Sequence, residues 1–266
     1  GIDASCDPKR TGLAVGRWCS KGTIRLVDLR LEKKARGGLQ AYILRWMSRG
    51  TVLLAIDAPL GGPDGLRKAL PSHVVGHRLG LVGAPSHSVF SRCTECIVRR
   101  ELPGTTVFST GADKLAVTGH RMLSELDVLR GVRPVPLLWN PPSSFLHDGA
   151  IEVFPGATLR GWGLKPGKYK TVIADRAALV AGITSTLPVN MRSSFKPTLL
   201  SDHNCLDAVV AMVAGRDFLA GAVRLPSSAE LKHARGANEG WIWFKPLSTP
   251  VPPISSTASA CDRDVP

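Results

Sequence analysis

The chain has 266 residues, enough for one large α/β domain or one domain with an insertion, and 44% of them are hydrophobic. No apolar run approaches the ~18 residues of a membrane-spanning helix, which excludes that class of protein. Lysine and arginine outnumber aspartate and glutamate by 34 to 21, and the net charge of +13 favours a polyanionic partner; a basic protein without such a partner is the alternative.

The first quarter of the chain predicts three strands, a helix and a fourth strand. Residues 1–4 resemble the end of a strand, and alternating runs at 11–18 and 23–29 predict a hairpin. Apolar residues at helical spacing predict a helix over 38–47. The unbroken apolar run 52–56 predicts a strand buried on both faces. This order places the first and fourth strands in parallel, joined by a crossover helix.

The remainder predicts an insertion and a second group of elements. Residues 61–148 are rich in Gly and Pro and predict an insertion at the functional edge of the sheet, with helices at 92–102 and 112–130. A short fifth strand is expected at 150–155, a helical turn at 157–162, and helices at 172–187 and 202–220. Residues 241–244 suit an edge strand or a packed terminal segment. We expect a single domain over 1–246 and a disordered Pro/Ser-rich tail over 247–266.

Six cysteines stand at irregular positions, and the single Cys93-x-x-Cys96 pair lacks the second pair that a structural zinc site needs. No signal-peptide pattern precedes the first predicted strand. We therefore expect reduced thiols and a cytoplasmic protein.

Four acidic residues occupy positions where an isolated charge is costly. Asp57 ends the buried run 52–56, and Asp3 and Glu152 lie in or at the end of two other predicted strands. Asp207 lies near the start of the helix predicted over 202–220. In open α/β sheets, ligands bind at the carboxyl ends of the strands, where these side chains would converge. Such a set of oxygens suits two Mg²⁺ or Mn²⁺ ions, which would activate water for phosphodiester cleavage.

Each carboxylate also has a purely structural explanation. Asp3 can accept backbone N–H bonds in the following turn, and Asp57 can start the turn at Ala58-Pro59. Glu152 can face water from an edge strand. Asp207 can face solvent, although its apolar neighbours argue against a polar helix face. The set of four is more persuasive than any one member.

Several motifs together resemble the domain-of-unknown-function 429 family. They lie in the family's order and cover the chain to about residue 246: Gly1-Ile2-Asp3-Ala4, Ile56-Asp57-Ala58-Pro59-Leu60, Glu152-Val153-Phe154-Pro155, Tyr169-Lys170, Ser201-Asp202-His203 with Leu206-Asp207-Ala208, and Glu239-Gly240-Trp241-Ile242-Trp243. The resemblance implies a ribonuclease H-like fold, with a mixed five-stranded sheet of three antiparallel and two parallel strands. It also implies nuclease activity with Asp3, Asp57 and Asp207 as the metal-binding core and Glu152 beside them. Within 61–148 only Arg92-x-x-Glu95 matches the family.

Other residues carry supporting predictions. Lys168, Lys170 and Arg176 suit binding of nucleic-acid phosphates, although a solvated helix edge explains them equally well. His203 lies one helical turn before Asp207 and suits proton transfer to a leaving oxygen, with a cap or surface role as the alternative. Pro85-Ser86-His87-Ser88 lacks the surroundings of a catalytic serine.

The sequence therefore supports three hypotheses in order. The first is a metal-dependent nuclease acting on DNA or RNA. The second is a non-catalytic nucleic-acid-binding or interaction module with the same fold. A phosphotransferase of the related actin-like fold ranks last, because residues 7–12 only faintly resemble its phosphate-binding hairpin.

Overall fold

The structure is a computed structural model that describes residues 1–19, 22–75, 89–110 and 113–247. Its strands are β1 (Ile2–Asp3), β2 (Gly12–Trp18), β3 (Ile24–Leu31), β4 (Leu53–Asp57), β5 (Gly149–Val153), β6 (Val189–Asn190) and β7 (Ile242–Trp243). Its α-helices are α1 (Gly38–Met47), α2 (Asp64–Ala69), α4 (Cys93–Glu101), α5 (Asp113–Arg130), α6 (Pro155–Gly161), α7 (Ile173–Thr186), α8 (Lys196–Ser201), α9 (His203–Leu219) and α10 (Ser228–Gly236). Short 3₁₀ helices are η1 (Pro8–Arg10), η3 (Glu32–Lys34), η4 (Leu70–Ser72) and η5 (Ser193–Phe195).

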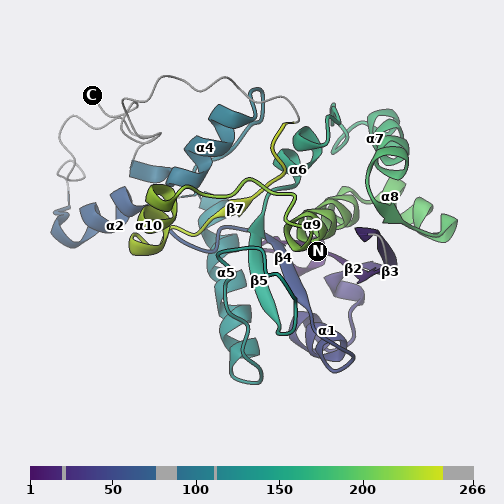
Figure 1. The fold of residues 1–266 in the computed structure, drawn as a ribbon, viewed down its shortest axis with the longest axis horizontal. Coiled ribbons are helices and arrows are strands. Elements are labelled where there is room, and N and C mark those ends of the chain that lie inside the picture. The colour runs from purple at the N-terminus through teal and green to yellow at the C-terminus, as the bar shows by residue number, and fades with distance from the viewer. Residues whose placement is uncertain (20–21, 76–88, 111–112, 248–266) are drawn as a thin grey trace.

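The described strands form one mixed seven-stranded sheet in the order β6-β3-β2-β1-β4-β5-β7 (Figure 1). β2 is antiparallel to β1 and β3, whereas β4, β5 and β7 run parallel to β1, and β6 runs parallel to β3. The prediction of five strands was therefore too low, because β6 and β7 extend the two edges. Each has only two residues, too few to produce a period-two pattern of side chains.

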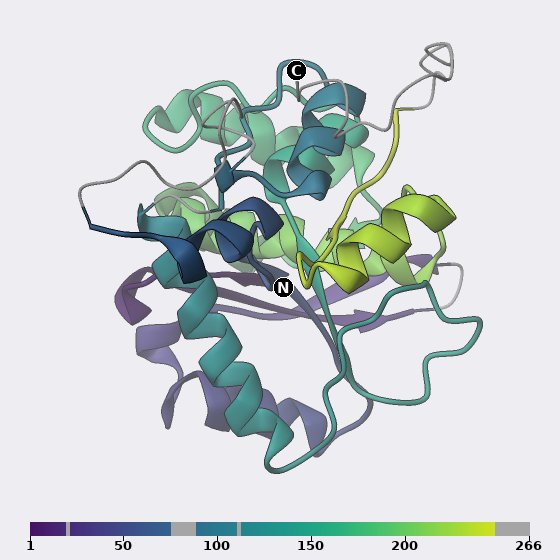
Figure 2. The same ribbon diagram turned by 90° about the vertical axis from the view of Figure 1, so that its left-hand side faces the viewer.

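The helices cover both faces of the sheet. One core joins β1, β2 and β4 to α1 and α5, while two others join the opposite face to α4, α6, α7 and α9. Figure 2 shows this division, with α1 and α5 on one side of the sheet and α4, α6 and α7 on the other. Along β4 the pleat alternates: Leu54 and Ile56 join the α1 and α5 core, and Ala55 joins the α9 side.

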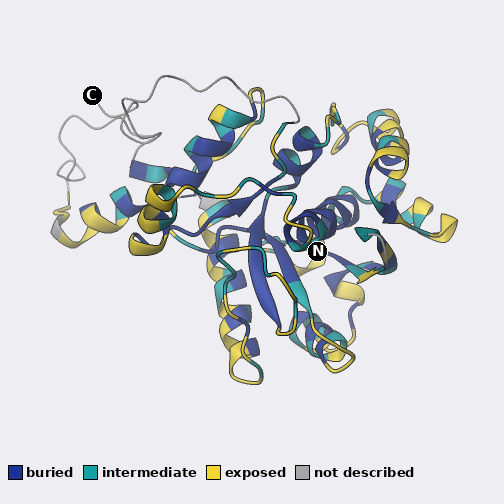
Figure 3. Ribbon diagram, viewed as in Figure 1, coloured by how far each residue is buried: buried dark blue, intermediate teal, exposed yellow. Residues whose placement is uncertain are grey.

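Helix α9 is the most deeply buried helix of the α/β core, and Figure 3 shows its dark blue ribbon against the sheet. Almost every residue from Cys205 to Phe218 is buried, as expected for a helix that is apolar on all sides. Glycines permit this close packing. A Cβ atom on Gly1 would lie 2.0 Å from the Ala208 carbonyl oxygen, and one on Gly12 would lie 2.1 Å from that of Asn204.

The region 61–148, predicted as an insertion, contributes α2, α4 and α5, and the last two pack into cores on opposite faces of the sheet. The predicted hairpin, the helix over 38–47 and the helix near 202–220 are confirmed. The segment 85–88 and all of the predicted tail except Leu247 lie outside the described residues. No helix in the described part of the chain is both long and apolar enough to cross a membrane.

Candidate carboxylate site

Asp3 and Asp57 end adjacent parallel strands and lie directly opposite each other. Their Cα atoms are register partners, as are those of Ile2 and Ile56. Since Ile2 and Ile56 belong to the core of α1 and α5, the pleat turns the two aspartates toward the α9 face. Asp3 is buried and Asp57 is partly exposed. The two carboxylates thus lie side by side at the carboxyl edge of the sheet.

Asp207 reaches the same edge from the first turns of α9. The Asp202 side chain caps this helix by accepting hydrogen bonds from the N–H groups of Asn204 and Cys205. Asp207 is 1% exposed. Its Oδ1 accepts a hydrogen bond from the Tyr169 hydroxyl, and its Oδ2 lies 3.0 Å from Lys170 Nζ. Helix packing through Gly1 and Gly12 brings this third carboxylate to the first two.

Electrostatics show that the three carboxylates face one another. Burial raises the pKa of Asp3 well above its ordinary value, and the charges of Asp207 and Asp57 raise it further. Burial followed by the charge of Asp207 raises the pKa of Asp57 to about 8. The Lys170 ammonium opposes both shifts, so it faces all three acids. The cluster has more negative charge than the protein compensates.

The segment carrying Tyr169 and Lys170 is fixed by Arg176. This buried guanidinium donates from Nε to the Tyr169 carbonyl oxygen at 2.8 Å and from Nη2 to that of Lys170 at 2.9 Å. Its Nη1 donates to the Leu200 carbonyl oxygen at 3.0 Å. Arg176 was predicted to bind nucleic-acid phosphate; in the structure it is buried and uses three of its five N–H donors on backbone carbonyl oxygens. It positions the two side chains that contact Asp207.

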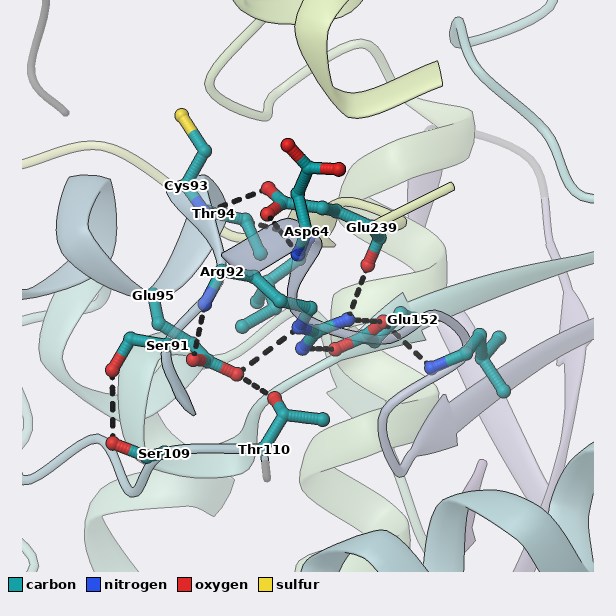
Figure 4. A network of polar contacts seen from close by, with 12 residues as sticks. Asp64, Ser91, Arg92, Cys93, Thr94, Glu95, Ser109, Thr110, Glu152 and Glu239 are labelled. Atoms are coloured by element: carbon teal, nitrogen blue, oxygen red, sulfur yellow. Dashed lines mark hydrogen bonds and ion pairs between the residues drawn. The ribbon is translucent and has the colours of Figure 1, made fainter. Parts of the chain in front are cut away.

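Glu152 lies on the other face of the sheet from the three aspartates, although its charge also raises the pKa of Asp57. Its register partner is Ile56, not Asp57, so the pleat points it away from the α9 face. Arg92 binds it bidentately, with Nη2 to Oε1 at 2.5 Å and Nη1 to Oε2 at 2.9 Å (Figure 4). Oε2 also accepts the Leu60 N–H at 2.9 Å. These donors satisfy both oxygens of the carboxylate predicted to complete the metal site.

Arg92 is the centre of a wider buried network, shown in Figure 4. Its Nε donates to Glu95, whose carboxylate also accepts from the Arg92 N–H and from Thr110. Burial works to lower the pKa of Arg92, but Glu152 and Glu95 outweigh it and raise that pKa. Sequence reasoning missed Arg92 as a partner of Glu152, although Arg92-x-x-Glu95 was a visible signal.

Glu239 extends this network to two more segments. Its side chain accepts the N–H groups of Asp64 and Cys93, and its carbonyl oxygen accepts from Arg92 (Figure 4). The starts of α2 and α4 are thereby joined to the turn before β7. The predicted insertion is fastened to the sheet by these buried hydrogen bonds.

The other predicted residues lie near the aspartate cluster. Lys168 is exposed on the segment that precedes Tyr169. His203 is half-buried at the first turn of α9; burial lowers its pKa, and Asp207 opposes that shift. Its imidazole is therefore predominantly neutral at pH 7.

The aspartate cluster fits a hard divalent cation in its chemistry. The donors are carboxylate oxygens, and Asp207 Oδ2 is buried without a hydrogen bond from any described residue. Its closest cationic contact is the Lys170 ammonium. Within the described ranges, no group of three or more His, Cys, Asp or Glu side chains is arranged to hold a metal ion. The structure thus presents the donor set with an ammonium group as its counter-charge.

A cavity of about 310 Å³ lies elsewhere, at the opposite edge of the sheet. It is lined by the starts of β1 and β4, the end of β2 and the later turns of α9. None of the site carboxylates lines it. The acidic cluster and this cavity are separate features.

Comparison with known proteins gives one family. The family model described as "Protein of unknown function (DUF429)" matches residues 1–231. The chain belongs to this family. No curated protein and no solved structure matches it.

Proposed function

We propose that this DUF429 protein is a metal-dependent nuclease that hydrolyses phosphodiester bonds of nucleic acid. The observation that carries the proposal is the meeting of Asp3, Asp57 and Asp207, with too few protein donors for their charge. The inner strand order β3-β2-β1-β4-β5, three antiparallel strands and then two parallel ones, supports a ribonuclease H-like core. Mg²⁺ or Mn²⁺ suits these oxygen ligands.

The chain's own residues have distinct roles in this proposal. Asp3, Asp57 and Asp207 would hold the cation, which would activate a water molecule and stabilise the leaving oxygen. His203, half-buried one helical turn before Asp207, would take part in proton transfer. Glu152 acts through the Leu60 N–H by fixing the loop after Asp57, as a positioning residue instead of a ligand.

Exposed cations beside the cluster support nucleic acid as the substrate. η1 follows β1, and η3 follows β3, which runs parallel to β1; both therefore lie at the same edge as Asp3. Glu32 of η3 is already paired with Arg121. Four exposed side chains of these helices have no ion pair among the described residues: Lys9, Arg10, Lys33 and Lys34.

Cleavage of labelled single- and double-stranded DNA and RNA by purified protein, with Mg²⁺, with Mn²⁺ and with chelator, tests the activity. We expect metal-dependent cleavage, reduced by about a thousandfold in Asp57→Asn, equivalent to ~4 kcal/mol of transition-state stabilisation. Asp127→Asn is the matched control, because this exposed carboxylate lies on α5 and pairs only locally with Arg130. Equal cleavage by wild type and Asp57→Asn would disprove the assignment.

The substrate surface has its own test. Replacing the four unpaired cations of η1 and η3 by glutamine should weaken nucleic-acid binding by about 10- to 100-fold at low salt and flatten its salt dependence. Binding is measured by fluorescence anisotropy in the Asp57→Asn background. The control removes the same charge from the opposite edge, at Arg17, Arg25, Arg45 and Arg49. Equal losses in both variants would mean that bulk charge, not this surface, binds the nucleic acid.

A non-catalytic nucleic-acid-binding module is the second candidate. It is favoured by the state of Asp207, whose two oxygens are held by Tyr169 and Lys170. Nucleic-acid binding without cleavage and without divalent-metal binding would select this function over the first.

A further inference from the structure

The Lys170 ammonium lies where a second metal ion would otherwise balance the negative charge of Asp207. Its Nζ lies 3.0 Å from Asp207 Oδ2, and no other described donor reaches that oxygen. The other oxygen, Oδ1, already accepts from the Tyr169 hydroxyl. Asp207 therefore has both oxygens engaged by the protein before any metal binds.

The backbone that carries the Lys170 ammonium is fixed by the buried Arg176. Although the Lys170 side chain is 57% exposed, its backbone carbonyl and that of Tyr169 are bound by the buried Arg176. The ring of Tyr169 lies 5.7 Å from Lys170 Nζ, within cation–π range. Lys170 is thus held at its ammonium by Asp207 and at its backbone carbonyl by Arg176.

The charge balance of the cluster argues for a single ion. Three ionised aspartates and one ammonium leave two negative charges, which one divalent cation neutralises. A second ion would have to displace the Lys170 ammonium from Asp207 Oδ2 or lie beside it, and the repulsion between the two positive charges makes that unfavourable. Glu152 is not free to hold a second ion, because both of its oxygens accept hydrogen bonds from Arg92 and the Leu60 N–H.

We propose that Lys170 supplies the second positive charge of the site, so that the site takes one divalent cation, held mainly by Asp3 and Asp57. This inference rests on the proposed metal-dependent function and replaces the two ions expected from the sequence. It also gives Lys170 a role distinct from that of Lys168, which is exposed on the same segment and has no ion pair among the described residues.

Titration of the full chain with Mn²⁺ tests the inference, with free Mn²⁺ followed by electron paramagnetic resonance. Wild type should bind one Mn²⁺ per chain. Lys170→Met should bind its first Mn²⁺ at least tenfold more tightly and take up a second ion, because a competing positive charge has been removed. Lys170→Arg should keep a stoichiometry of one, and Lys168→Met should match wild type.

The outcomes separate this inference from the proposed function. Two ions of similar affinity in wild type would overturn the inference and leave the nuclease proposal standing. Unchanged affinity and stoichiometry in Lys170→Met would also overturn it. Failure of wild type to bind any Mn²⁺ would overturn both. If Lys170→Met does not fold, the number of Mn²⁺ ions bound by wild type and by Lys170→Arg still tests the inference, because each should bind one.

Discussion

Two acidic clusters at the same end of the molecule have the same formal composition but differ in how their carboxylates are hydrogen-bonded. Asp3, Asp57 and Asp207 share one cation, Lys170. Glu95, Glu152 and Glu239 surround one cation, Arg92, with Glu239 bound through its carbonyl oxygen. Composition alone does not distinguish a binding site from a structural one.

The difference lies in the hydrogen bonds. Each glutamate accepts at least two backbone or side-chain donors, including the N–H groups of Leu60, Asp64 and Cys93. Among the described residues, no hydrogen bond reaches the carboxylate of Asp3 or Asp57, and Asp207 receives one from Tyr169. A cluster whose donors come largely from the backbone is complete when folded, whereas the aspartate cluster keeps carboxylate oxygens without such donors.

The largest expected effect comes from removing the cation of the complete cluster. Arg92→Met should lower the free energy of unfolding by about 3–5 kcal/mol, since it leaves Glu152 and Glu95 buried and unpaired. Thermal unfolding should show a fall of roughly 10 °C in Tm. Arg100→Met, on the same helix but at an exposed ion pair, is the control and should change the free energy by less than about 1 kcal/mol.

Asp57→Asn tests the aspartate cluster by the same measure, thermal stability. It removes one of three repelling carboxylates, so metal-free protein should unfold at an equal or higher temperature than wild type at pH 8. A loss of stability comparable to that of Arg92→Met would show that the aspartate cluster is also structural.

The next effect concerns pH. Since the folded-state pKa values of Asp3 and Asp57 are raised above those of the unfolded chain, the folded protein holds protons more tightly. Metal-free protein should therefore lose about 1–3 kcal/mol of stability as pH rises from 5 toward 8, the value near which Asp57 titrates. Chemical denaturation across this range measures the slope. Added Mn²⁺ should restore stability at pH 8 by binding the ionised carboxylates, and a slope unaffected by Asp57→Asn would contradict the assignment.

The sequence was sufficient for elements with long periodic patterns and for two of the site residues. The apolar run before Asp57 and the crossover helix together place Asp57 beside Asp3, and the structure has that pairing. The face of the sheet on which the Glu152 side chain lies could not be predicted, because it depends on the register between β4 and β5. A shift of one residue decides whether Glu152 points to Asp57 or to Arg92. Arg176 shows a similar limit, since a basic residue that binds backbone carbonyls resembles a phosphate-binding one in sequence.

The smallest expected effect tests how tightly the complete cluster is packed. Gly240 has φ of +79°, and a Cβ atom there would lie 3.2 Å from Glu152 Oε2 and 3.3 Å from Arg92 Nη1. Gly221 has a similar φ of +65° but nothing within 4 Å of such an atom. Both alanine variants incur the backbone cost of a left-handed residue, about 1 kcal/mol, so the difference between them isolates contact with the network. Gly240→Ala should be the less stable by a further ~1 kcal/mol in urea unfolding, and its metal affinity should not change. If the two variants were equally stable, the Arg92 cluster would have room for the added methyl group. Its difference from the aspartate cluster would then lie in its hydrogen bonds alone and not in its packing.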